Sequence, residues 1–289
     1  MHIAIFGNPG QSHSSAVIST IETIAAMPAC RITIESNFAA SLPDLTSRLS
    51  NTGISGNLPS GTDLVISFGG DGTFLQAVRW TGCQEVPLLG INTGHLGYLA
   101  AMPLPTQPEV LCKMISEHNW NIEPRSMLQV EIDGFHSPAY PNALNEVAIL
   151  KDRIATTISC SAWLDNRKIA TYPGDGLLIC TPTGSTAYNL SAGGPIVQPT
   201  LDTWVISPVA SHALTLRPLV VSSLNEIRVE AASRSGSFQL ALDGTATTLP
   251  TTASVRIKRA DFCTKVVRPS NTDWLDTLSE KLFWGARNS

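Results

Sequence analysis

The hydrophobic pattern of this 289-residue chain changes its period near Pro124, and that change limits the folds it can adopt. Before Pro124, short apolar runs alternate with segments whose apolar residues recur every three or four positions. Such an alternation of strands and helices predicts an α/β fold with a parallel, doubly wound sheet. The strand-like runs are HIAIF (2–6), RITIE (31–35) and DLVISFGG (63–70), and the helical segments are 14–27 and 73–80.

After Pro124, apolar and polar residues alternate with a period of two, which is typical of strands with one buried face. The Asp243-Gly244 pair in the last of these runs predicts a hairpin turn, because glycine tolerates the positive φ that such turns need. We therefore expect an all-β, sandwich-like domain in this half. The runs are 127–133, 157–165, 226–232 and 238–244.

The two patterns predict an α/β domain over residues 1–124 and a β-sandwich-like domain over 125–261. A helical segment at the end of the chain, 271–285, should pack back on the first domain, so that residues 262–289 complete it. Gly285 is the expected end of that helix. Its expected apolar face consists of Trp274, Leu275, Leu278, Leu282 and Phe283.

One stretch of the first domain gives a weaker signal. Residues 40–61 are rich in Ser, Asn, Gly and Pro, which favour turns and loops. We expect a loop there that contains one weak helix around Leu45 to Leu49.

Composition excludes several classes of protein. The hydrophobic fraction of 43% is enough for two ordinary cores. The 19 basic and 23 acidic residues are mixed along the chain, so we expect no nucleic-acid partner. The six cysteines form no C-x-x-C pair and are expected to be reduced thiols without zinc. The first apolar run is too short for a signal peptide or membrane span, which favours a cytoplasmic protein.

The segment Phe68-Gly69-Gly70-Asp71-Gly72-Thr73 follows a predicted strand and precedes a predicted helix. Ligands of open α/β sheets bind at this end of the strands. The glycines would let backbone N–H groups approach a phosphate, and Asp71 could accept the proton of an attacking hydroxyl. The alternative is that Asp71 only caps the helix.

Other familiar motifs are absent from the sequence. The glycines do not fit G-x-G-x-x-G because Leu75 stands where a glycine is needed, and no G-x-x-x-x-G-K-[ST] occurs. There is also no G-x-S-x-G and no H-E-x-x-H. These absences disfavour hydride-transferring Rossmann enzymes, P-loop ATPases, serine hydrolases and zinc proteases.

Two segments of the second half suit a nucleotide. Asn145-Glu146 opens an apolar strand and could bind a ribose diol, although both side chains reach one sugar only if the strand start is irregular. Residues 172–197 form a loop system rich in Gly, Ser and Thr that also contains Tyr188. The alternatives are a solvated strand end for the first segment and an ordinary connection for the second.

In this order and spacing the segments resemble the bacterial NAD kinase family. GGDG alone is shared with lipid kinases of the diacylglycerol and sphingosine type, whereas NEVAI and TPTGSTAY resemble only NAD kinases. The resemblance extends from the first strand to about Thr245. The matching segments are GGDGTFLQA (69–77), GINTGHLGYLA (90–100), NEVAI (145–149), GDGLLICTPTGSTAYNLSAGGPIV (174–197) and RPLVV (217–221).

The resemblance implies phosphoryl transfer from ATP, or from polyphosphate, to the 2′-hydroxyl of the adenosine ribose of NAD, giving NADP. It implies Mg²⁺ or another divalent cation that accompanies ATP, no dedicated protein ligands for a metal, and a homodimer or homotetramer. Asp71 would be the general base, and Gly72 would lie against the substrate. The implied dinucleotide-binding residues are Asn145, Glu146, Asp175, Thr186, Ala187, Tyr188, Asn189, Leu190 and Ser191, with Asp243 as a further candidate.

The sequence departs from many relatives at Pro173, where a basic or bulky residue is common, and at Thr245, where glutamine is common. Both departures bear on the preference between NAD and NADH. Two rival functions are a lipid kinase, which would not need Asn145-Glu146, and a dinucleotide sensor without turnover. A sensor is expected to lack the general base, whereas this chain has Asp71 at that position.

Overall fold

The computed structural model describes residues 1–49, 52–94, 97–100, 102–154, 156–270 and 272–282. Two compact units make up the chain. Unit 1 is Met1–Pro124 with Thr264–Ser289, and unit 2 is Arg125–Cys263. The chain passes from unit 1 to unit 2 within β7 (Trp120–Asp133) and returns within β18 (Ser254–Pro269). The predicted fold class is confirmed, since unit 1 is α/β with a carboxyl-terminal helix and unit 2 contains antiparallel sheets.

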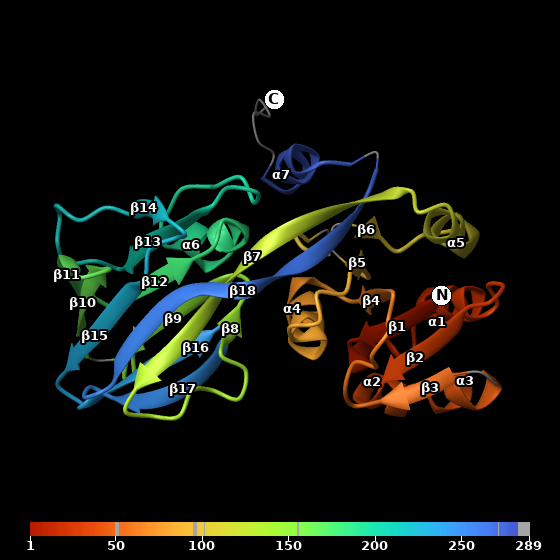
Figure 1. Cartoon of the computed structure of the whole chain (residues 1–289), viewed down its shortest axis with the longest axis horizontal. Coiled ribbons are helices and arrows are strands. Elements are labelled where there is room, and N and C mark those ends of the chain that lie inside the picture. The colour runs from red at the N-terminus through yellow and green to blue at the C-terminus, as the bar shows by residue number, and fades with distance from the viewer. Residues whose placement is uncertain (50–51, 95–96, 101, 155, 271, 283–289) are drawn as a thin grey trace. The chain divides into compact units, whose positions relative to one another are not determined.

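Unit 1 contains a parallel sheet with the order β18-β5-β4-β1-β2-β3, and β6 also pairs with β5 (Figure 1). From β1 the chain moves outward to β2 and β3 and then returns to place β4 on the other side of β1, so the strand order reverses between β1 and β4. The strands are β1 (His2–Gly7), β2 (Arg31–Glu35), β3 (Thr52–Ser55), β4 (Leu64–Phe68), β5 (Leu88–Asn92) and β6 (Met102–Pro103).

The helices of unit 1 are amphipathic and cover this sheet. In α1, Val17, Ile21 and Ile24 recur at helical spacing and are fully buried. Together with the apolar side chains of β1, β2 and β4 they form the main core of the unit. The helices are η1 (Pro9–Gln11), α1 (Ser15–Ala25), α2 (Ser36–Ala40), α3 (Pro43–Arg48), α4 (Asp71–Thr81), α5 (Pro108–Ser116) and α7 (Trp274–Leu282).

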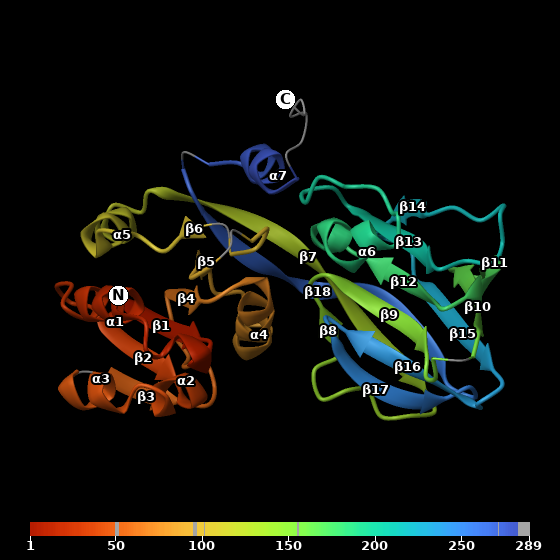
Figure 2. The same cartoon turned by 180° about the vertical axis from the view of Figure 1, so that it is seen from behind.

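Unit 2 is a sandwich of two antiparallel layers whose inner faces share one apolar core (Figure 2). One layer has the order β14-β13-β12-β9-β16-β17, and the other contains β11-β10-β15-β18 with β7 and β8. The elements are β8 (Asn142–Ala143), β9 (Glu146–Lys151), β10 (Ile158–Leu164), β11 (Arg167–Gly174), β12 (Gly176–Cys180), η2 (Thr183–Thr186), α6 (Tyr188–Ser191), β13 (Thr203–Val209), β14 (Leu219–Ser222), β15 (Ile227–Ser233), β16 (Ser237–Leu242) and β17 (Thr245–Pro250).

The predicted hairpin turn is confirmed. Leu242 pairs with Thr245 across a two-residue loop, and both loop residues have positive φ, 46° at Asp243 and 80° at Gly244. A two-residue loop with both φ values positive matches the right-handed twist of the flanking strands.

Other expectations need correction. Residues 40–61 contain the predicted weak helix, α3, but also the strand β3, which the glycine and serine content concealed. In α7, Leu275 is 58% exposed, whereas Thr277 and Leu278 are buried. Thr277 accepts a hydrogen bond from Arg268, so a polar side chain takes the inward position. Phe283 and Gly285 lie outside the described residues.

All six cysteines are free, and Cys160 and Cys180 are buried in unit 2 while Cys83 is exposed. Burial raises the pKa of the Cys160 thiol to about 12. Of the helices in the described ranges, none has the length and apolar character that crossing a membrane requires.

Candidate active site

Asp71 is the first residue of α4 and follows the carboxyl end of β4 in unit 1. β4 lies next to β1, where the strand order of the sheet reverses, and the Asn8 N–H donates to the Phe68 carbonyl at 3.1 Å across this point. Open α/β sheets bind their ligands at such a reversal, outside the carboxyl ends of the strands. The topology of unit 1 therefore puts the GGDG segment at the ligand-binding edge.

The Asp71 carboxylate accepts three backbone hydrogen bonds from one loop. The Tyr98 N–H donates to Oδ2, and the Leu99 and Ala100 N–H groups donate to Oδ1, each at 3.0 Å. A carboxylate has about four acceptor positions, so one position on Oδ2 stays available for a further donor. The alternative role as a helix cap does not fit, because the N-cap residue of α4 is Gly70 and the Asp71 oxygens bind a distant loop.

The loop 97–100 packs closely against its surroundings. A side chain at Gly97 would collide with the Asp71 carboxylate, and one at Gly90 of β5 would lie 2.7 Å from Ala100 Cα. By contrast, added Cβ atoms at Gly70 and Gly72 would meet no neighbour within 4 Å among the residues that the structure describes. Gly90 and Gly97 thus permit the loop to reach Asp71, while Gly70 and Gly72 leave the start of α4 open to a ligand.

In unit 2, the Asp243 side chain binds the backbone of residues 144–146, a segment that is called the corner below. Its carboxylate accepts the N–H groups of Leu144 at 2.7 Å, Asn145 at 2.8 Å and Glu146 at 3.1 Å. Leu144 and Asn145 form a bend directly before β9. The strand start is therefore irregular, which is the condition under which two neighbouring side chains can serve one sugar.

Glu146 is buried close to a second carboxylate, that of Asp243. It is 9% exposed, and its Oε2 has no hydrogen-bond partner among the described residues. Burial, and then the nearby Asp243 carboxylate, raise the pKa of Glu146 to about 8. At neutral pH its carboxyl group is protonated, so it can both donate and accept a hydrogen bond.

The loop of residues 181–191 is tied to the same corner. Thr181 donates its hydroxyl to the Leu144 carbonyl at 2.6 Å and its N–H to the Asn145 carbonyl at 2.9 Å. Gly184 packs so closely on Asn145 that a Cβ would overlap the Asn145 carbonyl group. Contacts within unit 2 thus bring together two segments that are distant in the sequence, NEVAI (145–149) and TPTGSTAY (181–188).

The predicted binding residues of this loop differ in exposure. Tyr188 is 38% exposed, Ser191 is exposed, and Thr186, Ala187 and Leu190 are partly buried. Asn189 is fully buried. Its Nδ2 donates to the carbonyls of Ser185 and Pro195, both at 3.0 Å, and its Oδ1 accepts from Ser207 at 2.6 Å. The Asn189 side chain therefore braces the loop from inside.

Asp175 is the single residue, in a bend, between β11 and β12. Its Oδ1 forms an ion pair with Lys151 Nζ at 2.7 Å, and its side chain is 37% exposed. The second oxygen can still accept a bond from a ligand. Nothing in the sequence pattern connects Asp175 with Lys151, which reads as part of a charged turn after a strand.

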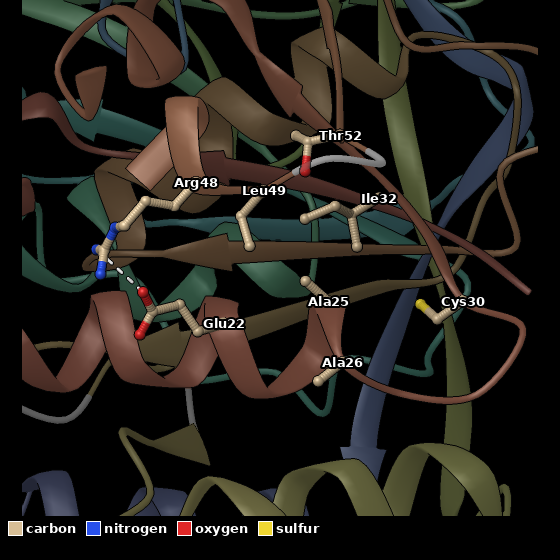
Figure 3. Close-up of a pocket in the computed structure, with 8 residues that line it drawn as sticks. All are labelled: Glu22, Ala25, Ala26, Cys30, Ile32, Arg48, Leu49 and Thr52. Atoms are coloured by element: carbon tan, nitrogen blue, oxygen red, sulfur yellow. Dashed lines mark ion pairs between the residues drawn. The ribbon is translucent and has the colours of Figure 1, made fainter. Parts of the chain in front are cut away.

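A separate cavity of about 170 Å³ in unit 1 contains none of the predicted site residues (Figure 3). It lies beside α1 and is lined by Ala25, Ile32 and Leu49, with the Glu22–Arg48 ion pair at 3.0 Å on its border. Cavities that hold nucleotide-sized ligands are typically larger, about 300–1,000 Å³. Elsewhere in the described part of the chain, no group of three or more His, Cys, Asp and Glu side chains could hold a metal ion.

Comparison with known proteins decides between the functions left open by the motifs. The family model for the ATP-NAD kinase N-terminal domain matches residues 3–119, and the model for the ATP-NAD kinase C-terminal domain matches residues 144–269. The chain belongs to the NAD kinase family. It is therefore a phosphotransferase that converts NAD to NADP, as the motifs led us to expect.

Curated members of the family match over nearly the full chain. The NAD kinase of Bacteroides fragilis is 40% identical over 287 residues, which cover 99% of both chains. That of Porphyromonas gingivalis is 39% identical over 285 residues, 98% of both chains. That of Flavobacterium johnsoniae is 34% identical and covers 99% of this chain and 98% of its own.

Two solved structures, of an NADH kinase and an NAD kinase, are similar to this chain over almost its full length. Yeast NADH kinase, complexed with NADH, superimposes with a TM-score of 0.86 at 22% identity, covering 100% of this chain and 89% of its own. An NAD kinase from Archaeoglobus fulgidus, in complex with ATP, gives 0.73 at 24% identity, covering 98% of this chain and 99% of its own. At these identities the likeness supports the fold.

Proposed function

We propose that the chain transfers the γ-phosphoryl group of ATP to the 2′-hydroxyl of the adenosine ribose of NAD, with Asp71 as the general base. The hydroxyl oxygen attacks phosphorus, the bond to the β-phosphate oxygen breaks, and the hydroxyl proton passes to Asp71 Oδ2. The products are NADP and ADP. In such transfers, positioning and charge stabilisation supply most of the catalysis.

The observation that carries the assignment is the state of the Asp71 carboxylate. Three N–H groups at 3.0 Å fix its orientation, and one acceptor position on Oδ2 is left. A fixed base with one open acceptor position is suited to take a proton from a positioned hydroxyl. A carboxylate that served only as a structural link would not need the open start of α4 beside it.

We assign dinucleotide binding to unit 2. Asn145 and the protonated Glu146 bind hydroxyl groups, and the exposed ring of Tyr188 packs on a base. Asp175, Thr186, Ala187, Leu190 and Ser191 line the site. Asn189 and Asp243, whose side chains are used within the protein, hold the loop and the corner in place. Gly72 belongs to the phosphate-binding start of α4.

A divalent cation fits this assignment as a partner of ATP. Mg²⁺ is usually bound by one or two carboxylates together with substrate phosphates rather than by an all-protein cage. Because the open position of the Asp71 carboxylate is assigned to the substrate hydroxyl, we assign the cation to the donor phosphates. When bound, Mg²⁺ would neutralise charge on the donor phosphates. We further propose a cytoplasmic homodimer or homotetramer that can use ATP or polyphosphate.

The first test is to incubate the purified protein with NAD, ATP and Mg²⁺ and to follow NADP with an NADP-specific dehydrogenase. We expect turnover that stops when EDTA is added. Parallel reactions with polyphosphate, and with NADH in place of NAD, define the donor and the acceptor preference that Pro173 and Thr245 put in question. Absence of NADP with every donor would contradict the proposal.

A further inference from the structure

We propose that Arg268 is a positioning residue for the Asp71 carboxylate and acts through the peptide group between Tyr98 and Leu99. The proposal rests on the proposed role of Asp71 as the base. Arg268 lies at the end of β18, within unit 1, and has no place among the motifs that resemble the family. Its contribution is visible only in the folded protein.

The geometry forms a short chain of hydrogen bonds. Arg268 donates an N–H from its second terminal nitrogen to the Tyr98 carbonyl at 3.2 Å. The N–H of the same peptide group, that of Leu99, donates to Asp71 Oδ1 at 3.0 Å. The peptide group between Tyr98 and Leu99 therefore accepts a hydrogen bond from the Arg268 guanidinium and donates one to the Asp71 carboxylate.

Arg268 is itself held rigidly. It is 2% exposed, and each of its three nitrogens has a partner. Besides the bond to Tyr98, Nε donates to Glu123 at 2.9 Å and the other terminal nitrogen donates to Thr277 of α7 at 3.3 Å. Lys281 of α7 also lies 5.4 Å from the centre of the Tyr98 ring. The end of β18 and α7 thus brace the loop that holds Asp71.

Two physical effects follow from this arrangement. A positive charge on the carbonyl polarises the peptide group, which strengthens the N–H bond to Asp71. The bracing also fixes the direction in which the free Oδ2 position points, and small misplacements of a catalytic group can cost about 10²-fold in rate. Both effects act on turnover through Asp71, and neither requires contact between Arg268 and substrate.

The test is a double-mutant cycle that combines Arg268→Met with Asp71→Asn. In the otherwise unchanged protein we expect Arg268→Met to lower kcat by about 10- to 100-fold, with KM for NAD changed less than about threefold. In the Asp71→Asn background the same substitution should change kcat less than about twofold, because the group it positions is gone. Equal losses in both backgrounds, or an unchanged kcat in the first, would overturn the proposal.

Two further variants keep the test decisive. Arg268→Lys retains the charge and one donor, so it should fold if Arg268→Met does not, and it should show a smaller loss that again disappears in Asp71→Asn. Arg256→Met is the matched control: Arg256 is on the same strand and pairs with Glu131 and Asp133, and it should leave kcat unchanged. If Asp71→Asn itself retains turnover, the proposed base assignment fails, which is a different result from additive losses in the cycle.

Discussion

At the scale of single residues, the closest restraint on the proposed base is Gly97. Any side chain there would collide with the Asp71 carboxylate, so Gly97→Ala must displace either the carboxylate or the loop. We expect kcat to fall by about 10²-fold or more and stability to fall by about 1–3 kcal/mol. Gly94→Ala is the control, since a Cβ at Gly94 would meet no described residue within 4 Å. Steady-state kinetics and urea unfolding of both variants check this, and equal behaviour would be evidence against the restraint.

Glu146 gives the chain a specific dependence on pH. Its pKa in the folded protein is about 8, against an ordinary value of 4.5, so the folded protein holds an extra proton between these values. The free energy of unfolding must therefore decrease as pH rises from about 5 to about 8. Glu146→Gln, which is neutral throughout, should lose this decrease and become more stable than the parent at high pH, by an amount on the order of a few kcal/mol.

Urea unfolding of the substrate-free protein at several pH values between about 5 and about 9 measures that difference. The comparison with Glu146→Gln removes contributions from all other titrating groups. Curves that stay parallel for the two proteins over this range would show that Glu146 is ionised like an ordinary surface carboxylate.

At the scale of elements, the loop of residues 181–191 depends on Asn189 for its shape. Asn189→Ala removes two donors and one acceptor from buried partners, which should cost about 1–3 kcal/mol. We expect KM for NAD to rise, because Tyr188 and its neighbours lose their support. Ser191→Ala, on the exposed side of the same loop, should leave the unfolding free energy within about 0.5 kcal/mol. A destabilisation of similar size in both variants would count against the bracing role.

Periodicity predicted the strands and helices whose buried faces repeat along the sequence, such as β2, α1 and β16. Periodicity failed where the structure depends on contacts between segments that are distant in the sequence. β3 has a glycine at its centre, and its strand state is fixed by pairing with β2. The inward side of α7 includes Thr277 because Arg268 binds it, so no count of apolar residues could select it.

The same division applies to the proposed site. Glycine spacing and the resemblance to NAD kinases are enough to select Asp71, Asn145 and Glu146 from the sequence alone. The groups that fix them follow from the fold: backbone N–H groups of residues 98–100 bind Asp71, and the Asp243 carboxylate binds the N–H groups of Asn145 and Glu146. Those contacts join residues far apart in sequence, and such pairs leave no periodic mark. Gly97 and Asp243 both lie within the stretch that resembles the family, which is the signal that the sequence gives for them.

At the scale of the whole molecule, the proposed function assigns different roles to the two units. In that proposal, unit 1 contains the base and the start of α4, and unit 2 contains the residues assigned to dinucleotide binding. This division predicts that substitutions in unit 1 act mainly on kcat and those in unit 2 mainly on KM for NAD. A unit 2 variant such as Asn145→Ala, with KM raised and kcat little changed, is the expected pattern, and the opposite pattern would contradict it.

The measurement that tests the account most directly is the turnover of Asp71→Asn with NAD, ATP and Mg²⁺. Asparagine keeps one oxygen for the Leu99 and Ala100 N–H groups but is no base. The account predicts a fall in kcat of at least about 10²-fold, with Kd for NAD changed less than about threefold and the unfolding transition retained. A folded variant that binds NAD and turns over within about threefold of the parent would contradict the assignment of Asp71.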